Sequence, residues 1–208
     1  MKKSLLFFPS LASTLLLFIA GCSMSAIYKP PTGNLDQMNY SKIINKGFDD
    51  TWDALINYSA GTFFGIENFE KESGLITLTF GASNPEDYIT GGYWKVDVVR
   101  GANSLHFEGD YVEYLRTYQS GELLGKMNIV VKDVDSTHSR VTVNAKYVFT
   151  AEQVLETGQR YSNTWSFSSG SCDEVTPANR TPGTPPTRTL CPTYKAEKSV
   201  LEAIETIE

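Results

Sequence analysis

The sequence is poor in the residues that carry most acid–base and nucleophilic chemistry. It contains only two histidines, His106 and His138, and three cysteines in 208 residues. Histidine is the side chain whose ordinary pKa lies closest to neutral pH, so two copies leave little room for a catalytic triad. The motifs G-x-S-x-G, H-E-x-x-H and G-x-x-x-x-G-K are absent as well. The composition therefore predicts a protein that is not an enzyme and needs no cofactor.

Basic residues are also scarce, with 18 Lys and Arg against 24 Asp and Glu. Contacts to phosphate need clustered Lys and Arg, so nucleic acid is not an expected partner. An acidic surface likewise disfavours a flat hold on anionic lipid. Attachment to a membrane, if it occurs, is therefore expected to use a covalent anchor.

A short apolar run near the start of the chain supplies such an anchor. Lys2 and Lys3 precede a largely apolar stretch that ends at Ile19, which is the order of a secretory signal and is too short to span a bilayer. The following Ile19-Ala20-Gly21-Cys22 resembles the lipobox of bacterial lipoproteins, with Ile in place of the usual Leu. In that family the cysteine is acylated and becomes the first residue of the mature protein. Ser23, rather than Asp, after the cysteine implies delivery to the outer membrane.

This resemblance divides the chain into three parts. Residues 1–21 are expected to be a signal peptide, and residues 22–38 a flexible tether from the lipidated Cys22, because Pro30-Pro31 and Thr32-Gly33-Asn34 favour extended or turning backbone. Residues 39–208 are expected to form one domain. Without Lys2 and Lys3, 16 basic residues stand against 24 acidic ones, a formal net charge of −8.

Two cysteines remain after Cys22 is assigned to the anchor. Export leads to an oxidising compartment, where Cys172 and Cys191 are expected to pair. The alternative, free thiols or a metal site, lacks neighbouring ligands. The bond would tie together the ends of residues 168–191, a proline-rich segment for which no regular structure is predicted.

The stretch from Lys46 to Phe80 organises the predicted fold. Residues 52, 55, 56, 59 and 63 recur at helical spacing and predict an amphipathic helix, which Asp49 or Asp50 would cap and Gly61 would end. Alternating apolar residues over 75–80 predict a strand. A short strand is also expected within residues 40–46.

The rest of the chain alternates with period two and predicts an antiparallel meander. The expected strands cover residues 94–99, 105–115, 127–132, 140–149 and 161–167. Pro192 would begin a final helix, with Val200, Leu201 and Ile204 on its apolar stripe and Glu197 on its polar side. The predicted fold class is α+β, a β-meander sheet packed by an N-terminal and a C-terminal helix.

This element order is similar to the helix-grip family of folds. Phe48, Trp52 and the run Glu72-Ser73-Gly74-Leu75-Ile76 resemble the helix and following strand in domains of the BamC family of outer-membrane lipoproteins. The resemblance covers about a sixth of the chain and implies a fold, but it transfers no functional residue and no partner.

Candidate contact residues come from one loop and one predicted hairpin. Glu86, Asp87 and Tyr88 lie in the turn-rich segment 81–92, and Tyr114 lies near the end of a predicted strand. Together they form the candidate interaction surface of an envelope protein that binds or scaffolds an unidentified protein partner at the outer membrane, with the domain in the periplasm or at the cell surface.

Two further interpretations remain open from the sequence. The aromatic residues Trp94, Phe107, Tyr147, Trp165 and Phe167 could line a cavity for a small hydrophobic ligand between the sheet and the last helix, although a filled core is favoured. On a strand, His106, Glu108 and Asp110 would project together and could hold a metal or a proton, although a solvated strand face is favoured.

Overall fold

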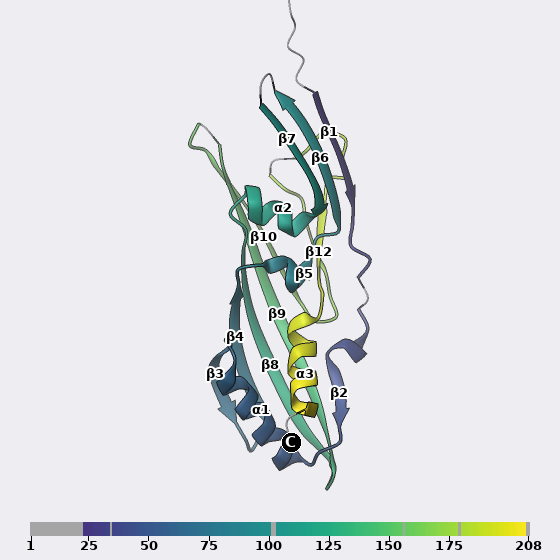
Figure 1. Ribbon diagram of the computed structural model, residues 1–208, viewed down its shortest axis with the longest axis vertical. Coiled ribbons are helices and arrows are strands. Elements are labelled where there is room, and N and C mark those ends of the chain that lie inside the picture. The colour runs from purple at the N-terminus through teal and green to yellow at the C-terminus, as the bar shows by residue number, and fades with distance from the viewer. Residues whose placement is uncertain (1–22, 34, 101–102, 156, 179, 207–208) are drawn as a thin grey trace, which may run out of the picture.

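A long, twisted antiparallel sheet forms the body of the molecule in the computed structural model, which describes residues 23–33, 35–100, 103–155, 157–178 and 180–206 (Figure 1). Within these ranges six strands make up the sheet, in the order β10-β9-β8-β4-β3 with β2 also paired to β9. Their bounds are Ser41–Ile44 (β2), Gly65–Glu70 (β3), Leu75–Ala82 (β4), Glu122–Asp135 (β8), His138–Val154 (β9) and Arg160–Ser168 (β10). The fold is α+β, as the sequence predicts.

Strands β2 and β10 share one edge of β9. β10 pairs with residues 146–154 of β9, and β2 pairs with residues 139–142. The gap between them is closed at Ala145, whose carbonyl accepts from the Ser169 backbone N–H at 2.9 Å and whose N–H donates to Ser169 Oγ at 2.8 Å. Both backbone polar groups of Ala145 therefore have a hydrogen-bond partner in the gap between β10 and β2.

A second, three-stranded sheet stands at the end of the molecule where the described chain begins (Figure 1). It contains β1 (Ser23–Lys29), β6 (Tyr93–Arg100) and β7 (Asn103–Asp110), with β1 antiparallel to β6 from the Ser23↔Val99 pair to Lys29↔Tyr93. The prediction of a flexible tether over residues 22–38 is therefore wrong for Ser23–Lys29, which form a paired strand. Cys22 itself lies outside the described residues.

The proline-rich segment holds short strands, which corrects the expectation of no regular structure there. β11 (Asp173–Val175) pairs with β12 (Arg188–Pro192), and β12 pairs with β5 (Ile89–Thr90) within the predicted loop 81–92. The predicted disulfide is confirmed, because Cys172 and Cys191 are bonded with their Cα atoms 4.4 Å apart. It fastens the start of the segment to β12.

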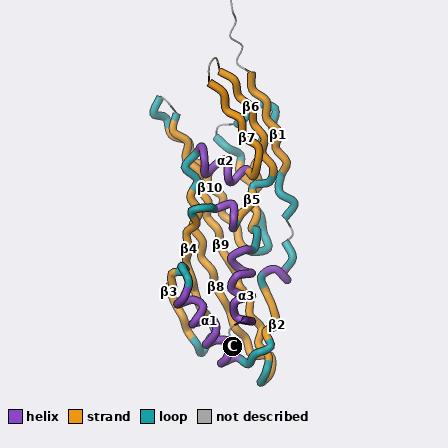
Figure 2. Tube along the Cα trace, in the orientation of Figure 1, coloured by secondary structure: helices purple, strands orange, loops and turns teal. Residues whose placement is uncertain are grey.

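Helix α1 (Phe48–Gly61) and helix α3 (Lys195–Thr206) lie side by side on the inner face of the long sheet, as Figure 2 shows. The predicted helix begins at Phe48, earlier than expected, and ends at Gly61 as expected, with Trp52, Leu55 and Ser59 buried. Its N-cap is Gly47 without a side-chain cap bond, so capping by an aspartate was wrong; Asp49 instead pairs with Lys71 Nζ at 2.9 Å. Phe63 lies beyond the helix and is 63% exposed.

A helix that the sequence did not predict interrupts the meander. β7 ends at Asp110, and α2 (Tyr111–Tyr118) follows in place of a continued strand. Asp110 caps it, since Oδ1 accepts from the Val112 N–H at 2.8 Å. Tyr111 and Leu115, four residues apart, therefore lie on one face of a helix, where they are buried.

The final helix begins three residues later than expected. Pro192 ends β12, and Tyr194, with φ of 63°, turns the chain into α3 at Lys195. None of the helices in the described ranges is long and apolar enough to cross a membrane.

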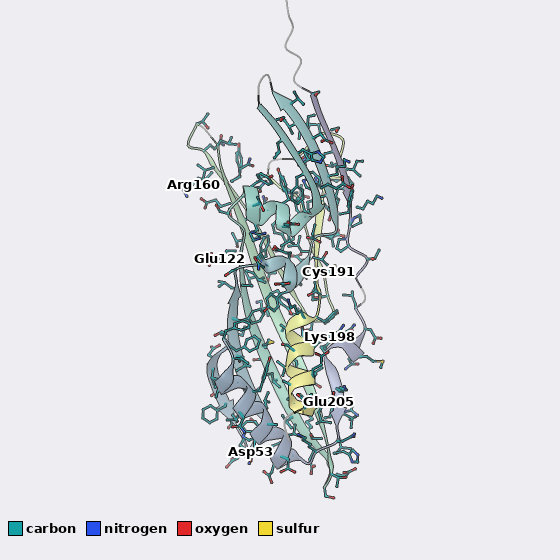
Figure 3. All side chains as sticks on the ribbon, viewed as in Figure 1. Asp53, Glu122, Arg160, Cys191, Lys198 and Glu205 are labelled. Atoms are coloured by element: carbon teal, nitrogen blue, oxygen red, sulfur yellow. A yellow bond between two sulfur atoms is a disulfide. The ribbon has the colours of Figure 1, made fainter. Side chains whose placement is uncertain are left out.

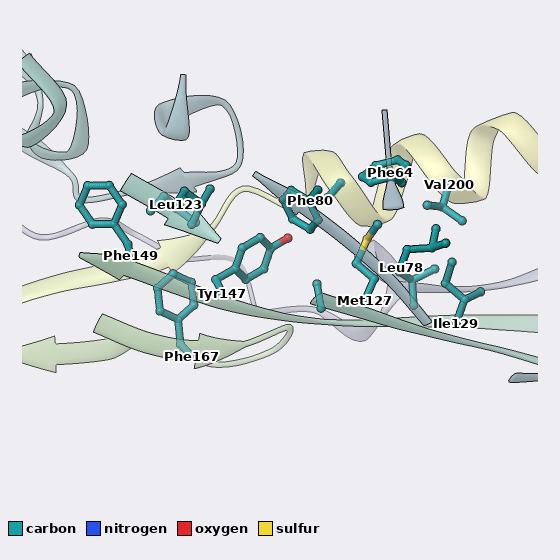
Figure 4. Close-up of a cluster of buried hydrophobic side chains, with 14 of the residues drawn as sticks. Phe64, Leu78, Phe80, Leu123, Met127, Ile129, Tyr147, Phe149, Phe167 and Val200 are labelled. Carbon is teal, nitrogen blue, oxygen red and sulfur yellow. The ribbon is translucent and has the colours of Figure 1, made fainter. Parts of the chain in front are cut away.

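The core fills the space between the inner face of the long sheet and the helices, and Figure 4 shows part of it. Every second residue is buried from Leu123 to Val131 in β8 and from Ser139 to Ala151 in β9, while their neighbours face outward. Tyr147 stacks on Phe167 with ring centroids 5.5 Å apart and meets Phe80 edge-on at 6.1 Å. Four of the five aromatic residues that could have lined a cavity are buried in the core, and the fifth, Phe107, is half-buried against it.

Gly125 shows how closely this core is packed. A Cβ at this position would overlap the Phe80 ring on the neighbouring strand. We expect Gly125→Ala to lower the free energy of unfolding by about 1–3 kcal/mol, since the ring must leave its place. Gly61→Ala is the matched control, because nothing lies within 4 Å of the added methyl at the end of α1, and it should stabilise by about 0.5 kcal/mol. Urea unfolding of both variants checks the pair, and equal effects would contradict the packing argument.

Candidate functional site

The predicted contact residues of the 81–92 loop join two helices. A 3₁₀ turn over Pro85–Asp87 (η2) places the Glu86 carboxylate against the Arg116 guanidinium of α2 at 2.9 Å. The next residue, Asp87, meets Lys195 Nζ of α3 at 2.8 Å. Both acids are thus engaged within the chain.

Tyr88 belongs to the same junction. Its ring lies 5.4 Å from that of Phe80 and beneath Lys195 Nζ at 5.6 Å, and its carbonyl accepts from the Thr193 N–H at 2.9 Å. Partial burial raises the pKa of its hydroxyl. Glu86, Asp87 and Tyr88 therefore tie α2 and α3 to the loop between β4 and β6.

Tyr114 lies apart from these three residues. It is two positions from Arg116 on α2, so the two side chains point to different sides of the helix. Its ring packs in a cluster with Trp94 at 5.7 Å, Phe107 at 5.4 Å and Tyr118 at 5.1 Å. Burial raises the pKa of the Tyr114 hydroxyl. Of the four predicted contact residues, Tyr114 alone lines the cleft described next.

A cleft of about 520 Å³ opens beside Tyr114, at the end of the molecule where β1 begins. Four separate parts of the chain line it: the three-stranded sheet, α2, the end of β9 and the proline-rich segment. We call it the N-terminal cleft. Its lining residues are Met24, Val98, Ser104, Leu105, Tyr114, Gln119, Gln153, Arg180, Thr181 and Pro182.

The chemistry of the N-terminal cleft suits binding. One wall is apolar, with Met24 still 43% exposed and Leu105 half-buried. The rim is polar and includes one charged side chain, Arg180, from the proline-rich segment. Among the described residues, the lining contains no carboxylate, histidine or cysteine, and these residues therefore offer no acid–base pair and no strong metal ligands.

The His106, Glu108 and Asp110 side chains each have different partners. His106 Nδ1 contacts Asp97 at 2.5 Å, and Glu108 accepts from Lys95 and from the Tyr93 hydroxyl, each at 2.9 Å. Hydrogen bonds from those two donors hold the pKa of Glu108 below its usual value. Asp110 caps α2 and accepts from Thr90 Oγ1 at 2.6 Å. In the described ranges no cluster of three His, Cys, Asp or Glu residues is arranged to hold a metal ion.

Glu197, which the sequence pattern places on the polar side of the last helix, is buried between α3 and β9. Glu197 is fully buried, and it accepts from the Tyr147 hydroxyl at 2.6 Å and from Ser169 Oγ at 2.7 Å. Burial raises the pKa of Glu197, and the same burial together with the neighbouring carboxylate raises the pKa of Tyr147. Glu197 lies three residues before Val200 and four before Leu201, a spacing that puts it on the same helix face as these apolar residues. This spacing was the signal in the sequence that Glu197 is buried. Glu197 and Tyr147 are both buried, and their hydrogen bond fastens α3 to β9.

A second buried polar group holds the proline-rich segment. Arg188 is 2% exposed, with its guanidinium 4.6 Å from the Tyr28 ring centre and 5.1 Å from that of Trp94. It donates to the Pro185 carbonyl and to Thr184 Oγ1, both at 2.6 Å. Arg188 therefore links the segment that bears Arg180 to β1 and β6 through cation–π contacts.

Comparisons with known proteins add no relative to this picture. No protein-family model matches the chain, and neither curated proteins nor solved structures give a match.

Proposed function

We propose that this chain is an outer-membrane lipoprotein, anchored through an acylated Cys22, that serves as a non-enzymatic protein-interaction module in the bacterial cell envelope. The lipobox-like Ile19-Ala20-Gly21-Cys22 supports the anchor. Several acyl chains at one cysteine hold a protein to a bilayer far more firmly than one chain does.

The observation that carries the interaction role is the N-terminal cleft. Its apolar wall, its tyrosine and its polar rim have the composition of protein docking sites, which combine aromatic and Met residues at the centre with polar groups around them. Tyr118, next to Tyr114 in the aromatic cluster, is 45% exposed and extends the available apolar surface.

The N-terminal cleft lies beside β1, the strand that directly follows the expected anchor residue. β1 pairs with β6 from Ser23 onward, so an acyl group on the preceding residue would leave no flexible spacer between lipid and sheet. Met24, in the same strand, lines the cleft. The partner would then be met close to the membrane surface, and the opposite end of the long sheet would point away from it.

Site-specific photocrosslinking in cells tests this proposal. A benzoylphenylalanine at Leu105 should capture one envelope protein, while the same group at Val134, which is 51% exposed at the opposite end of the sheet, should not. Cys22→Ser should move the protein from the membrane to the soluble fraction and reduce the Leu105 crosslink. Recovery of Cys22→Ser in the membrane fraction would contradict the anchor. Equal crosslinks from both positions would contradict the docking role of the cleft.

A small amphipathic ligand is the second candidate, because about 520 Å³ lies within the usual volume range of small-molecule sites. Native mass spectrometry of the purified chain distinguishes the two candidates. A bound small molecule that is lost in Leu105→Glu, with no protein crosslink, would favour the ligand.

A further inference from the structure

The outer face of the long sheet, opposite the helices, carries cations in directly opposed pairs. Lys126 on β8 faces Lys146 on β9. Six residues further along the same two strands, Lys132 faces Arg140. All four side chains are exposed. Like charges directly across a strand pair destabilise a sheet, so each opposed pair has a cost in folding.

Cations elsewhere in the described part of the chain are commonly matched by carboxylates. Ion pairs join Lys42–Glu205, Lys71–Asp49, Lys95–Glu108, Arg116–Glu86, Arg160–Glu152 and Lys195–Asp87. On the outer face, Lys126 meets Glu67 at 2.7 Å, but Lys132, Arg140 and Lys146 form no ion pair with any described residue. Acidic residues outnumber basic ones in the whole chain, so these unmatched cations are not a consequence of excess positive charge.

An apolar groove of about 640 Å³ adjoins the Lys126–Lys146 pair. Its lining includes Thr79, Gly81 and Gly65 of β3 and β4, and the side chains of Phe63 and Leu124. These two apolar side chains are 63% and 57% exposed. Exposed large apolar residues around a hollow mark a place where another molecule's side chain can be buried.

We propose that this groove and the four cations dock an extended, acidic segment of a partner protein. The two cation pairs are six residues apart along both strands, roughly 20 Å in a β-sheet, which an extended segment of about six residues spans. One apolar side chain of the segment enters the groove between Phe63 and Leu124. Acidic side chains meet Lys126 and Lys146 first, and Lys132 and Arg140 at the far end.

The combination of groove and charge identifies the class of partner. A purely ionic surface would suit any polyanion, but an adjacent apolar groove rewards a chain that alternates apolar and acidic side chains, as a protein segment does. A membrane surface is disfavoured because the protein as a whole is acidic. The site extends the proposed interaction role to a second surface, yet it does not depend on Cys22 or on the N-terminal cleft, so either can fail without the other.

Fluorescence anisotropy with the purified full-length chain in detergent tests the proposal. The probe is a labelled peptide of about twelve residues with one Phe and two Asp clusters six residues apart, a length that covers the roughly 20 Å between the cation pairs. Matched probes replace Asp by Asn or Phe by Ser. The acidic apolar probe should bind, added salt should weaken it, and Lys146→Glu should weaken it by about tenfold or more. Leu124→Ser should also weaken it.

The controls separate recognition from folding. Lys146→Glu should leave Tm unchanged or raise it, because the new carboxylate would face Lys126 in place of a second cation. Lys198→Glu, on exposed Lys198 of α3 (Figure 3), should change binding little. The proposal is overturned if the acidic probe does not bind, if the Asn or Ser probe binds as well, or if Lys146→Glu has no effect. Equal binding to anionic phosphatidylglycerol vesicles, or self-association with the same dependence on Lys146, would also overturn it.

Discussion

Replacing Cys172 and Cys191 together by Ser is expected to lower the free energy of unfolding by about 3 kcal/mol, since the bond closes a loop of about twenty residues. The physical reason is the greater freedom that the unfolded chain gains once the cross-link is gone. Urea unfolding under oxidising conditions measures the difference. Reducing agent should destabilise the wild-type protein by a similar amount and leave the double variant unchanged. A wild-type protein that is indifferent to reductant would contradict the expectation.

The same substitution should also disturb the N-terminal cleft. Residues 180–182, which line it, belong to the segment that the disulfide and Arg188 hold against the two sheets. If the crosslink from Leu105 requires an ordered cleft, it should fall when the disulfide is reduced. Crosslinking that persists unchanged after reduction would place the docking residues on the sheet and α2 alone.

The long strands were predicted well because the alternation of apolar and polar residues is visible within each strand's own sequence. β8 and β9 alternate buried and exposed residues along most of their length, and period-two hydrophobicity reads this directly from the sequence. The α1 boundary at Gly61 was equally local. The α+β class followed from these elements.

The misplaced elements depend on information that periodicity alone does not carry. Tyr111 and Leu115 share a face on either a strand or a helix, because four is close to a multiple of both periods. Asp110 was the deciding signal, as an N-cap at the start of α2. β1 had no comparable signal: its Ser-rich sequence becomes a strand because β6, some 70 residues later in the chain, supplies its hydrogen-bonding partner.

The candidate sites were less predictable than the fold for the same reason. The N-terminal cleft is assembled from Met24, the β6–β7 strands, Tyr114, Gln153 and residues 180–182, which are distant in sequence. Only Tyr114 was singled out beforehand. The opposed cations on the outer face depend on the register of β8 against β9, which a single sequence does not reveal.

Glu197→Ala is expected to be among the most destabilising single substitutions in the chain, by about 3 kcal/mol, because it leaves the buried Tyr147 hydroxyl without an acceptor and removes a second acceptor from Ser169 Oγ. Tyr147 and Ser169 both donate to the Glu197 carboxylate, and Ser169 Oγ also lies 3.4 Å from the Ala145 carbonyl. Glu197→Gln keeps an oxygen acceptor and nearly the same volume, so it should cost far less. Similar losses in the Ala and Gln variants, measured by urea unfolding, would show that the hydrogen bonds are unimportant.

The pH dependence of these variants tests the charge on Glu197 separately. Burial raises the pKa of Glu197 in the folded protein above its usual value of 4.5, so the folded state holds this proton more tightly than the unfolded chain. The stability that this group contributes is therefore complete below about pH 4.5 and is lost as the pH rises through the raised pKa. Glu197→Gln cannot titrate, so the stability of the wild type relative to this variant should fall with rising pH. Asp135, whose pKa is lowered to about 2 by hydrogen bonds from His138 and Thr137, cancels in this difference because both proteins contain it. Stability curves that stay parallel above pH 4.5 would mean that the Glu197 carboxyl gains no extra affinity for its proton on folding.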